Sequence, residues 1–154
     1  NEDVMVVSPD VGSTARARAF SMKLGLNMAI VDKRREKANQ SEVMNIIGNV
    51  EGKTCILLDD IVDTAGSLCG AAKAIKEIGG AKEVYACATH GVLSGNAIER
   101  IGESCIKELL LLDTIPYPAD KPKCSKIDYI STAAVFAEAI RRIYEEVSIS
   151  NLFD

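Results

Sequence analysis

Two adjacent carboxylates, followed by a short run of small and hydroxylated residues, form the most chemically informative segment of the chain. Asp59 and Asp60 directly follow the apolar run at residues 54–58. A turn of small and polar residues comes next, before an Ala-rich stretch: Asp63, Thr64, Ala65, Gly66 and Ser67. We expect this turn to open a helix, where unpaired backbone N–H groups and the helix dipole favour an anion.

Each part of this segment matches one part of a sugar phosphate. Adjacent carboxylates accept hydrogen bonds from vicinal hydroxyls, such as those of a ribose, or hold a divalent cation. Small residues in the turn let a phosphate approach the backbone closely. The alternative is that Asp63 or Thr64 only caps the following helix and that the pair at Asp59 and Asp60 is merely solvated. The complete segment favours the ligand site.

The composition excludes several other classes of protein. The 154 residues, 47% of them hydrophobic and 26% charged, are typical of one globular domain with its own core. The net charge of −4 and the pI near 5.1 argue against a general nucleic-acid-binding protein. No apolar stretch approaches the ~18 residues that indicate a membrane span, and residues 1–7 show no signal-peptide pattern. We therefore expect no nucleic-acid partner and no membrane association.

The cysteines indicate the redox environment. The chain has five of them, an odd number, and they are far apart with no CxxC pair. This spacing is typical of free thiols and not of a disulfide framework or a zinc site. We expect a reducing compartment and a cytoplasmic protein.

The elements that must position these residues alternate along the chain. Strands are expected at residues 4–8, 28–31, 43–47, 54–58, 84–89, 108–112 and 127–130. Helices are expected at residues 13–24, 67–78, 96–101 and 132–147. This alternation predicts a three-layer α/β fold, a mainly parallel sheet flanked by helices, in which ligands bind at the carboxyl ends of the strands.

Some local features of these elements are also predicted. Gly25 follows the first helix as a C-cap, and Ser131 precedes the last helix as an N-cap. Residues 32–40 are polar apart from Ala38 and predict a mobile loop. The apolar stripe at residues 132–147 predicts a core helix or a subunit interface and not a ligand site.

The carboxylate and turn segment resembles the phosphoribosyl-pyrophosphate (PRPP) loop of type I phosphoribosyltransferase folds. Four further segments resemble the ribose-phosphate pyrophosphokinase (PRPP synthetase) family, at residues 31–39, 42–48, 88–95 and 113–116. The resemblance covers essentially the whole chain but corresponds to the C-terminal half of those enzymes. It implies one phosphoribosyltransferase-like domain at residues 1–154, within a longer two-domain protein. The start at Asn1, without an initiator Met, leads us to expect sequence upstream.

The resemblance also implies an activity and its catalytic residues. The family transfers the β,γ-pyrophosphoryl group of MgATP to the 1-hydroxyl of ribose 5-phosphate, giving PRPP and AMP. Lys33 and Arg35 match the two cations of the family's flexible catalytic loop. Mobile cations suit this chemistry, because negative charge spreads over phosphoryl oxygens in the transition state. The alternative for this charge run is a solvated basic loop.

Two binding segments follow from the same resemblance. The residues at 59, 60 and 63–67 match the ribose 5-phosphate site. The family's pyrophosphate loop matches Asp10, Val11, Gly12 and Ser13, with Asp10 at the position associated with Mg²⁺. The family usually has Gly-Gly at Gly12-Ser13, and we expect Ser13 to take the required backbone angles at a cost. The alternative for Asp10 is a turn former after Pro9.

Further expectations concern the remaining residues and the partners. His90, the single histidine, is expected to be a satisfied hydrogen-bonding residue without a catalytic role. Ser148 and Ser150 resemble C-terminal serines that contact regulatory phosphate or ADP in the family. The resemblance implies a homo-oligomer, a hexamer, with ATP bound largely by the N-terminal half and a neighbouring subunit. We therefore expect these 154 residues alone to lack synthetase activity.

Other functions remain open from the sequence. A PRPP-consuming phosphoribosyltransferase would need a base-recognising hood, and no such segment is evident. A catalytically silent, synthetase-associated regulatory subunit is favoured by Ser13 and opposed by the intact segment at Lys33 and Arg35. A purely structural module would bind no ribose 5-phosphate.

Overall fold

A seven-stranded sheet forms the centre of the part of the chain that the computed structural model describes, residues 3–34 and 43–153. The strands are β1 (Val4–Ser8), β2 (Asn27–Arg34), β3 (Val43–Ile47), β4 (Thr54–Val62), β5 (Glu83–Gly91), β6 (Ile106–Leu112) and β7 (Ile127–Ile130). Their order is β3-β2-β1-β4-β5-β6-β7. All neighbours pair in parallel except β2 and β3, which are antiparallel. The predicted mainly parallel sheet is therefore confirmed.

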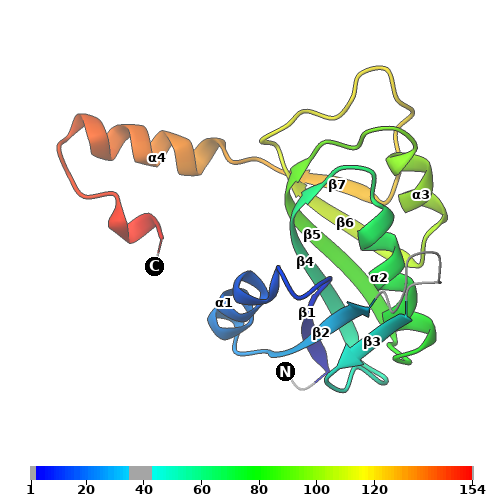
Figure 1. Cartoon of the computed structure of the whole chain (residues 1–154). Coiled ribbons are helices and arrows are strands. Elements are labelled where there is room, and N and C mark those ends of the chain that lie inside the picture. The colour runs from blue at the N-terminus through cyan, green and yellow to red at the C-terminus, as the bar shows by residue number, and fades with distance from the viewer. Residues whose placement is uncertain (1–2, 35–42, 154) are drawn as a thin grey trace.

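Helices cover both faces of this sheet (Figure 1). They are α1 (Thr14–Leu24) on one face, and α2 (Gly66–Glu77) and α3 (Ala97–Glu103) on the other. The helix α4 (Ala133–Tyr144) and a short 3-10 turn at Ser150–Leu152 follow the last strand. The larger core lies between the sheet and α2 and α3, where Leu57, Ile75 and Leu111 are fully buried. A smaller core under α1 joins Val6, Ala17 and Leu58. These layers confirm the three-layer α/β prediction.

The strand β4 is longer than its apolar segment predicts. It continues beyond Leu58 to Val62, and Asp59 pairs with Ala88 of β5. Parallel pairing with the nine-residue strand β5 supplies the backbone hydrogen bonds that keep the polar residues extended. The expectation that the two carboxylates follow the strand is therefore wrong, since they lie within it.

The strand β2 also extends into a segment predicted as a loop. It runs to Arg34, and its antiparallel partner β3 pairs Lys33 with Met44. The prediction of a mobile loop is therefore wrong for Asp32, Lys33 and Arg34, because cross-strand hydrogen bonds hold their backbone. The rest of that predicted loop, residues 35–40, lies outside the described residues.

The ends of α1 and α4 test two predicted caps. Gly25 follows α1 with a left-handed backbone, φ 64°, and its N–H bonds the Met22 carbonyl, which confirms the C-cap. The N-cap of α4 is Thr132 and not Ser131. Asp113, which follows β6, accepts hydrogen bonds from the Thr132 N–H, the Thr132 hydroxyl and the Ser131 hydroxyl. This carboxylate sets the start of the helix one residue later.

The helix α4 contributes nothing to the core. It extends away from the sheet (Figure 1), and none of its residues is buried. Its apolar stripe is exposed, with Val135, Phe136, Ile140 and Ile143 each 59–66% accessible. The expectation of a core helix is wrong for this chain, and the expectation of a subunit interface stays a prediction. No helix among residues 3–34 and 43–153 has the length and apolar character to cross a membrane.

Gly79, just after α2, is a test of how tightly the larger core is packed. A Cβ at this position would lie 2.4 Å from Val50 Cγ2 and 2.7 Å from the Ile75 carbonyl oxygen. The carbonyl belongs to the α2 backbone and has little room to move. We expect Gly79→Ala to lower the free energy of unfolding by about 1–3 kcal/mol, measured by urea denaturation.

Gly102→Ala is the matched control for this substitution. Gly102 is exposed within α3, and the nearest atom to an added Cβ is Cys124 Sγ at 3.7 Å, an ordinary contact. Alanine is favoured over glycine inside a helix, so we expect stability that is unchanged or raised by up to about 1 kcal/mol. Equal effects of the two substitutions would contradict the tight packing around Gly79.

Candidate functional site

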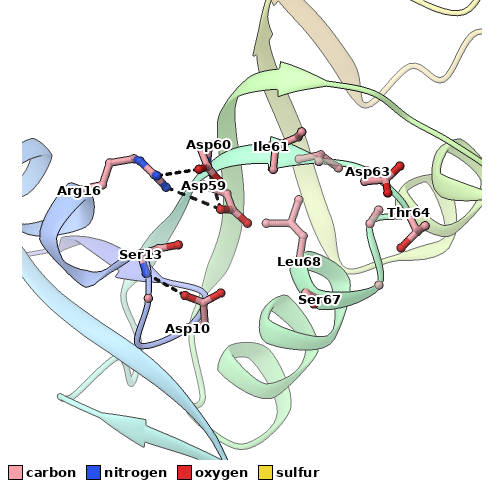
Figure 2. Close-up of a pocket in the computed structure, with 14 residues that line it drawn as sticks. Asp10, Ser13, Arg16, Asp59, Asp60, Ile61, Asp63, Thr64, Ser67 and Leu68 are labelled. Atoms are coloured by element: carbon pink, nitrogen blue, oxygen red, sulfur yellow. Dashed lines mark hydrogen bonds and ion pairs between the residues drawn. The ribbon is translucent and has the colours of Figure 1, made fainter.

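A cavity of about 410 Å³ opens at the carboxyl edge of β1 and β4 (Figure 2). Its wall is formed by Asp10, Gly12, Ser13, Arg16, Asp59, Asp60, Ile61, Val62, Asp63, Thr64, Ala65, Gly66, Ser67 and Leu68. The chain leaves β1 toward α1 on one face of the sheet and leaves β4 toward α2 on the other. The cavity therefore lies at the switch point of the sheet, where open α/β folds bind their ligands.

Most of the binding residues predicted from the sequence line this cavity. All seven residues matched to ribose 5-phosphate line it, and so do three of the four matched to pyrophosphate. Val11 is the exception, since it does not line the cavity and is 62% exposed. Ser148 and Ser150 hydrogen-bond each other near the C-terminal end, beyond α4, and do not line the cavity.

The turn that opens α2 leaves its backbone N–H groups available. Ala65 is the N-cap, with a left-handed backbone at φ 59°, and no side chain caps the helix. The first backbone bond of the helix runs from the Cys69 N–H to the Ala65 carbonyl. The alternative that Asp63 or Thr64 caps α2 is therefore wrong. Within the described part of the chain, the N–H groups of Gly66 and Ser67 make no backbone hydrogen bond and are placed to bind an anion.

Contacts from a loop, a helix and a strand hold this turn in place. The Ser94 hydroxyl donates to Asp63. The Arg100 guanidinium, on α3, donates from Nη1 to the Thr64 carbonyl at 2.6 Å. Lys33 Nζ, on β2, lies 3.4 Å from the Ser67 carbonyl oxygen and donates to it. Lys33 does not line the cavity, but this contact brings the predicted catalytic cation to the predicted phosphate turn.

The carboxylate pair faces an arginine that the sequence analysis does not identify. Arg16 Nη2 lies 2.8 Å from Asp60 Oδ2, and Arg16 Nη1 lies 3.8 Å from Asp59 Oδ1 (Figure 2). The side chain of Asp59 is 15% exposed, whereas that of Asp60 is 51% exposed. Arg16 partly neutralises the pair from the side of α1.

The pKa values of the two carboxyl groups are shifted in opposite directions. Burial raises the pKa of Asp59, and the negative charges of Asp60 and Asp10 raise it further. Burial opposes ionisation of Asp60 as well, but the interactions with Asp59 and Arg16 outweigh it and lower the pKa of Asp60. Asp60, which lies closer to Arg16, is therefore the more acidic of the two.

The turn after β1 forms the opposite wall of the cavity. Asp10 Oδ1 accepts a hydrogen bond from the Ser13 N–H at 2.8 Å, and the Ser8 hydroxyl donates to the Asp10 carbonyl. Asp10 thus acts as a turn former while its carboxylate also lines the cavity. The backbone of Ser13 has φ −87° and ψ 1°, angles open to any residue. The expected cost of serine at this position is therefore wrong.

His90 takes part in the hydrogen bonding of the strand ends. Its Nδ1 lies 2.8 Å from Thr114 Oγ1, and that hydroxyl donates its proton to the Thr89 carbonyl. The hydroxyl oxygen therefore accepts a hydrogen bond from His90 Nδ1–H. This confirms the expected satisfied histidine.

Two arginines at the site, Arg16 and Arg100, are absent from the sequence-based candidates. Arg16 is the third residue of α1 and follows Asp10 by six positions, a spacing that keeps it near the carboxyl end of β1. That spacing is a signal that sequence reasoning can use. Arg100 lies 36 residues from its partner Thr64, and no local pattern links the two.

Comparison with known proteins places the chain in a family. Residues 34–154 match the model of the phosphoribosyl synthetase-associated domain. The chain is 60% identical to ribose-phosphate pyrophosphokinases from Clostridium tetani, over 99% of this chain and 47% of that protein, and from Caldanaerobacter subterraneus, over 99% and 48%. It thus spans about half the length of these curated relatives.

Solved structures agree with the sequence relatives. The phosphoribosylpyrophosphate synthetase from Mycobacterium smegmatis superposes with a TM-score of 0.84 and 38% identity, covering 94% of this chain and 46% of that one. An orotate phosphoribosyltransferase from Aeropyrum pernix, with a TM-score of 0.57 and 13% identity, shares the fold alone. With the sheet order and the cavity described above, these matches establish that the chain belongs to the phosphoribosyl synthetase-associated domain family.

Proposed function

We propose that the chain forms one half of a ribose-phosphate pyrophosphokinase and supplies its ribose 5-phosphate site. The observation that carries this proposal is that a carboxylate pair and an uncapped helix N-terminus line the same cavity. Vicinal hydroxyls and a phosphate are the chemical complements of these two walls. The names of the relatives, which are 60% identical over 99% of the chain, support the same substrate.

Each end of ribose 5-phosphate has a defined place in this proposal. Asp59 and Asp60 accept hydrogen bonds from the ribose hydroxyls. The 5-phosphate binds the N–H groups at the start of α2 and the hydroxyls of Thr64 and Ser67. The left-handed backbone of Ala65 supports this placement, because it turns the chain sharply at the point where the phosphate would lie.

The reaction needs orientation and charge neutralisation more than a protein nucleophile. The 1-hydroxyl oxygen of the sugar forms a bond to the β-phosphorus of ATP. The bond between that phosphorus and the oxygen that bridges it to the α-phosphorus breaks. AMP leaves with that electron pair, and the hydroxyl proton is released. Lys33, which already reaches the phosphate turn, is proposed to stabilise the transferring group. Arg35, proposed for the same role, lies outside the described residues.

The residues around the cavity fit a magnesium ion that is bound partly by the protein and partly by substrate phosphates. Among residues 3–34 and 43–153, no group of three or more His, Cys, Asp or Glu side chains is arranged to hold a metal ion. Mg²⁺ in phosphoryl-transfer sites usually takes only one or two carboxylates and completes its shell with phosphates and water. We propose Asp10 as its ligand, with Asp59 nearby. When bound, the ion neutralises phosphate charge.

The proposal extends to partners that lie beyond this chain. ATP is proposed to bind mainly to the other half of the enzyme and to a neighbouring subunit, within a homo-oligomer, a hexamer by family resemblance. The 154 residues alone are therefore proposed to bind ribose 5-phosphate without turning it over. The silent regulatory subunit loses the support that Ser13 lent it, because Ser13 takes ordinary backbone angles.

Calorimetric titration of the chain with ribose 5-phosphate tests the site directly. We expect saturable binding, and at least tenfold weaker binding of ribose, which lacks the phosphate that the start of α2 would hold. Asp60→Asn should also weaken binding of ribose 5-phosphate, whereas Asp120→Asn, in an exposed loop, should not. A wild-type chain without heat of binding would exclude the proposed site.

A second test concerns Lys33 in the polypeptide that carries both halves. Lys33→Ala should lower kcat for PRPP formation by about 10²–10³-fold, because a positioned charge near the transferring group is lost. The KM for ribose 5-phosphate should change little. Lys73→Ala, on the outer side of α2 in an exposed pair with Glu77, is the control and should keep wild-type turnover. Unchanged turnover in Lys33→Ala would remove its catalytic role.

A third test concerns the charge of Arg16. Its cation favours the ionised form of Asp60, so Arg16→Gln should raise the pKa of that carboxyl group toward its ordinary value. Arg18→Gln removes the same charge from an exposed position on α1 and should leave the pKa unchanged. Carbon-13 NMR of the aspartate carboxyl groups across a pH titration measures both. Equal pKa values in the two variants would show that the ion pair has no electrostatic role.

A further inference from the structure

We propose that Arg100 is a positioning residue of the phosphate turn. By bonding the Thr64 carbonyl from outside the cavity, it directs the Ala65 N–H toward the bound phosphate. This inference rests on the proposed function, since it concerns the same ribose 5-phosphate site. It adds a residue that lies outside every segment of the proposed site and that does not itself line the cavity.

Arg100 contacts the turn from the side opposite the site cavity. Its Nη1 donates to the Thr64 carbonyl oxygen at 2.6 Å and lies 3.3 Å from the position of a Cβ on Gly66. Gly66 lines the site cavity and also a second cavity, of about 610 Å³, whose wall includes Arg100. The turn is therefore a thin partition, with the substrate site on one side and the guanidinium on the other.

Because the peptide bond is planar, the contact of Arg100 with the Thr64 carbonyl fixes the direction of the Ala65 N–H. In a trans peptide unit the C=O and the N–H point in opposite directions. The carbonyl of Thr64 points to Arg100, so the N–H of Ala65, in the same peptide unit, points to the opposite side. The proposal places the cavity and the 5-phosphate on that side, since Thr64 and Ala65 both line the cavity.

The backbone at Ala65 explains why the turn needs an external contact. Its φ of 59° is a left-handed conformation that residues with a Cβ disfavour. Such a conformation persists where surrounding contacts determine it. A bond from a charged donor to a carbonyl is stronger than one between neutral groups.

The position and the charge of Arg100 fit this role. Its own carbonyl accepts a hydrogen bond from Cys69 Sγ, at 3.8 Å, which joins α3 to α2 beside the turn. Across the described ranges, no carboxylate lies within ion-pair distance of its guanidinium. Its charge therefore also favours an anion on the far side of the turn.

Arg100→Met tests this proposal, because methionine keeps an unbranched side chain and removes both the donor and the charge. In calorimetry of the chain, we expect the Kd for ribose 5-phosphate to rise about tenfold, which corresponds to about 1.4 kcal/mol. The Kd for ribose should stay within twofold of wild type. Arg18→Met, which removes a charge from an exposed position on α1, should leave both unchanged.

The amide resonance of Ala65 distinguishes positioning from a general structural role. In a proton–nitrogen NMR titration of the wild-type chain, ribose 5-phosphate should shift the Ala65 N–H strongly downfield. In Arg100→Met this shift should fall by at least half, while thermal unfolding stays as in wild type. Arg100→Gln, which is shorter and uncharged, gives the same measurement if the methionine variant does not fold.

The outcomes separate this inference from the function on which it rests. If the wild-type chain does not bind ribose 5-phosphate, the proposed function fails and the inference fails with it. If the wild-type chain binds, and the folded Arg100 variant keeps both the wild-type Kd and the Ala65 shift, only the inference is overturned. A higher Kd with an unchanged Ala65 shift also overturns it, because the loss then comes from charge alone.

Discussion

The parallel pairing of β1 with β4 is the constraint on which the rest of the site depends. The two strands run side by side, but the chain leaves β1 toward α1 on one face and leaves β4 toward α2 on the other. The turns after them therefore diverge, and a cavity of about 410 Å³ opens between them. Asp10 reaches it from one turn and Thr64 from the other. Neither turn forms a site without its neighbour.

Opposite charges are then arranged around that cavity by separate means. Asp59 and Asp60 bring negative charge on the strand, and Arg16 on α1 balances part of it. The start of α2 brings partial positive charge from the backbone, and no side-chain cap occupies it. Lys33 and Arg100 add full charges that contact carbonyl oxygens of the turn. The cavity therefore has one wall suited to hydroxyl groups and another suited to a phosphate.

The last helix is separate from this arrangement. Asp113 holds the start of α4 at the edge of the sheet, and the three hydrogen bonds from Ser131 and Thr132 lower the pKa of that carboxyl to about 2. Beyond that point none of the residues of α4 is buried, and its apolar stripe is exposed. The site is therefore complete, so far as this chain supplies it, without any contribution from α4.

The amino-acid sequence by itself determined the alternation of strands and helices, the carboxylate pair and the small-residue turn. Each of these depends on residues close together in the chain, through apolar periodicity, β-branched content or helix-start chemistry. Only the tertiary structure decided that β4 continues through Asp59 and Asp60, because the hydrogen bonds that extend it come from β5. It also decided that Arg16 pairs with Asp60 and that Arg100 holds Thr64, contacts between residues 44 and 36 positions apart. Local sequence patterns do not predict such partners, because only the folded chain brings them within hydrogen-bonding distance.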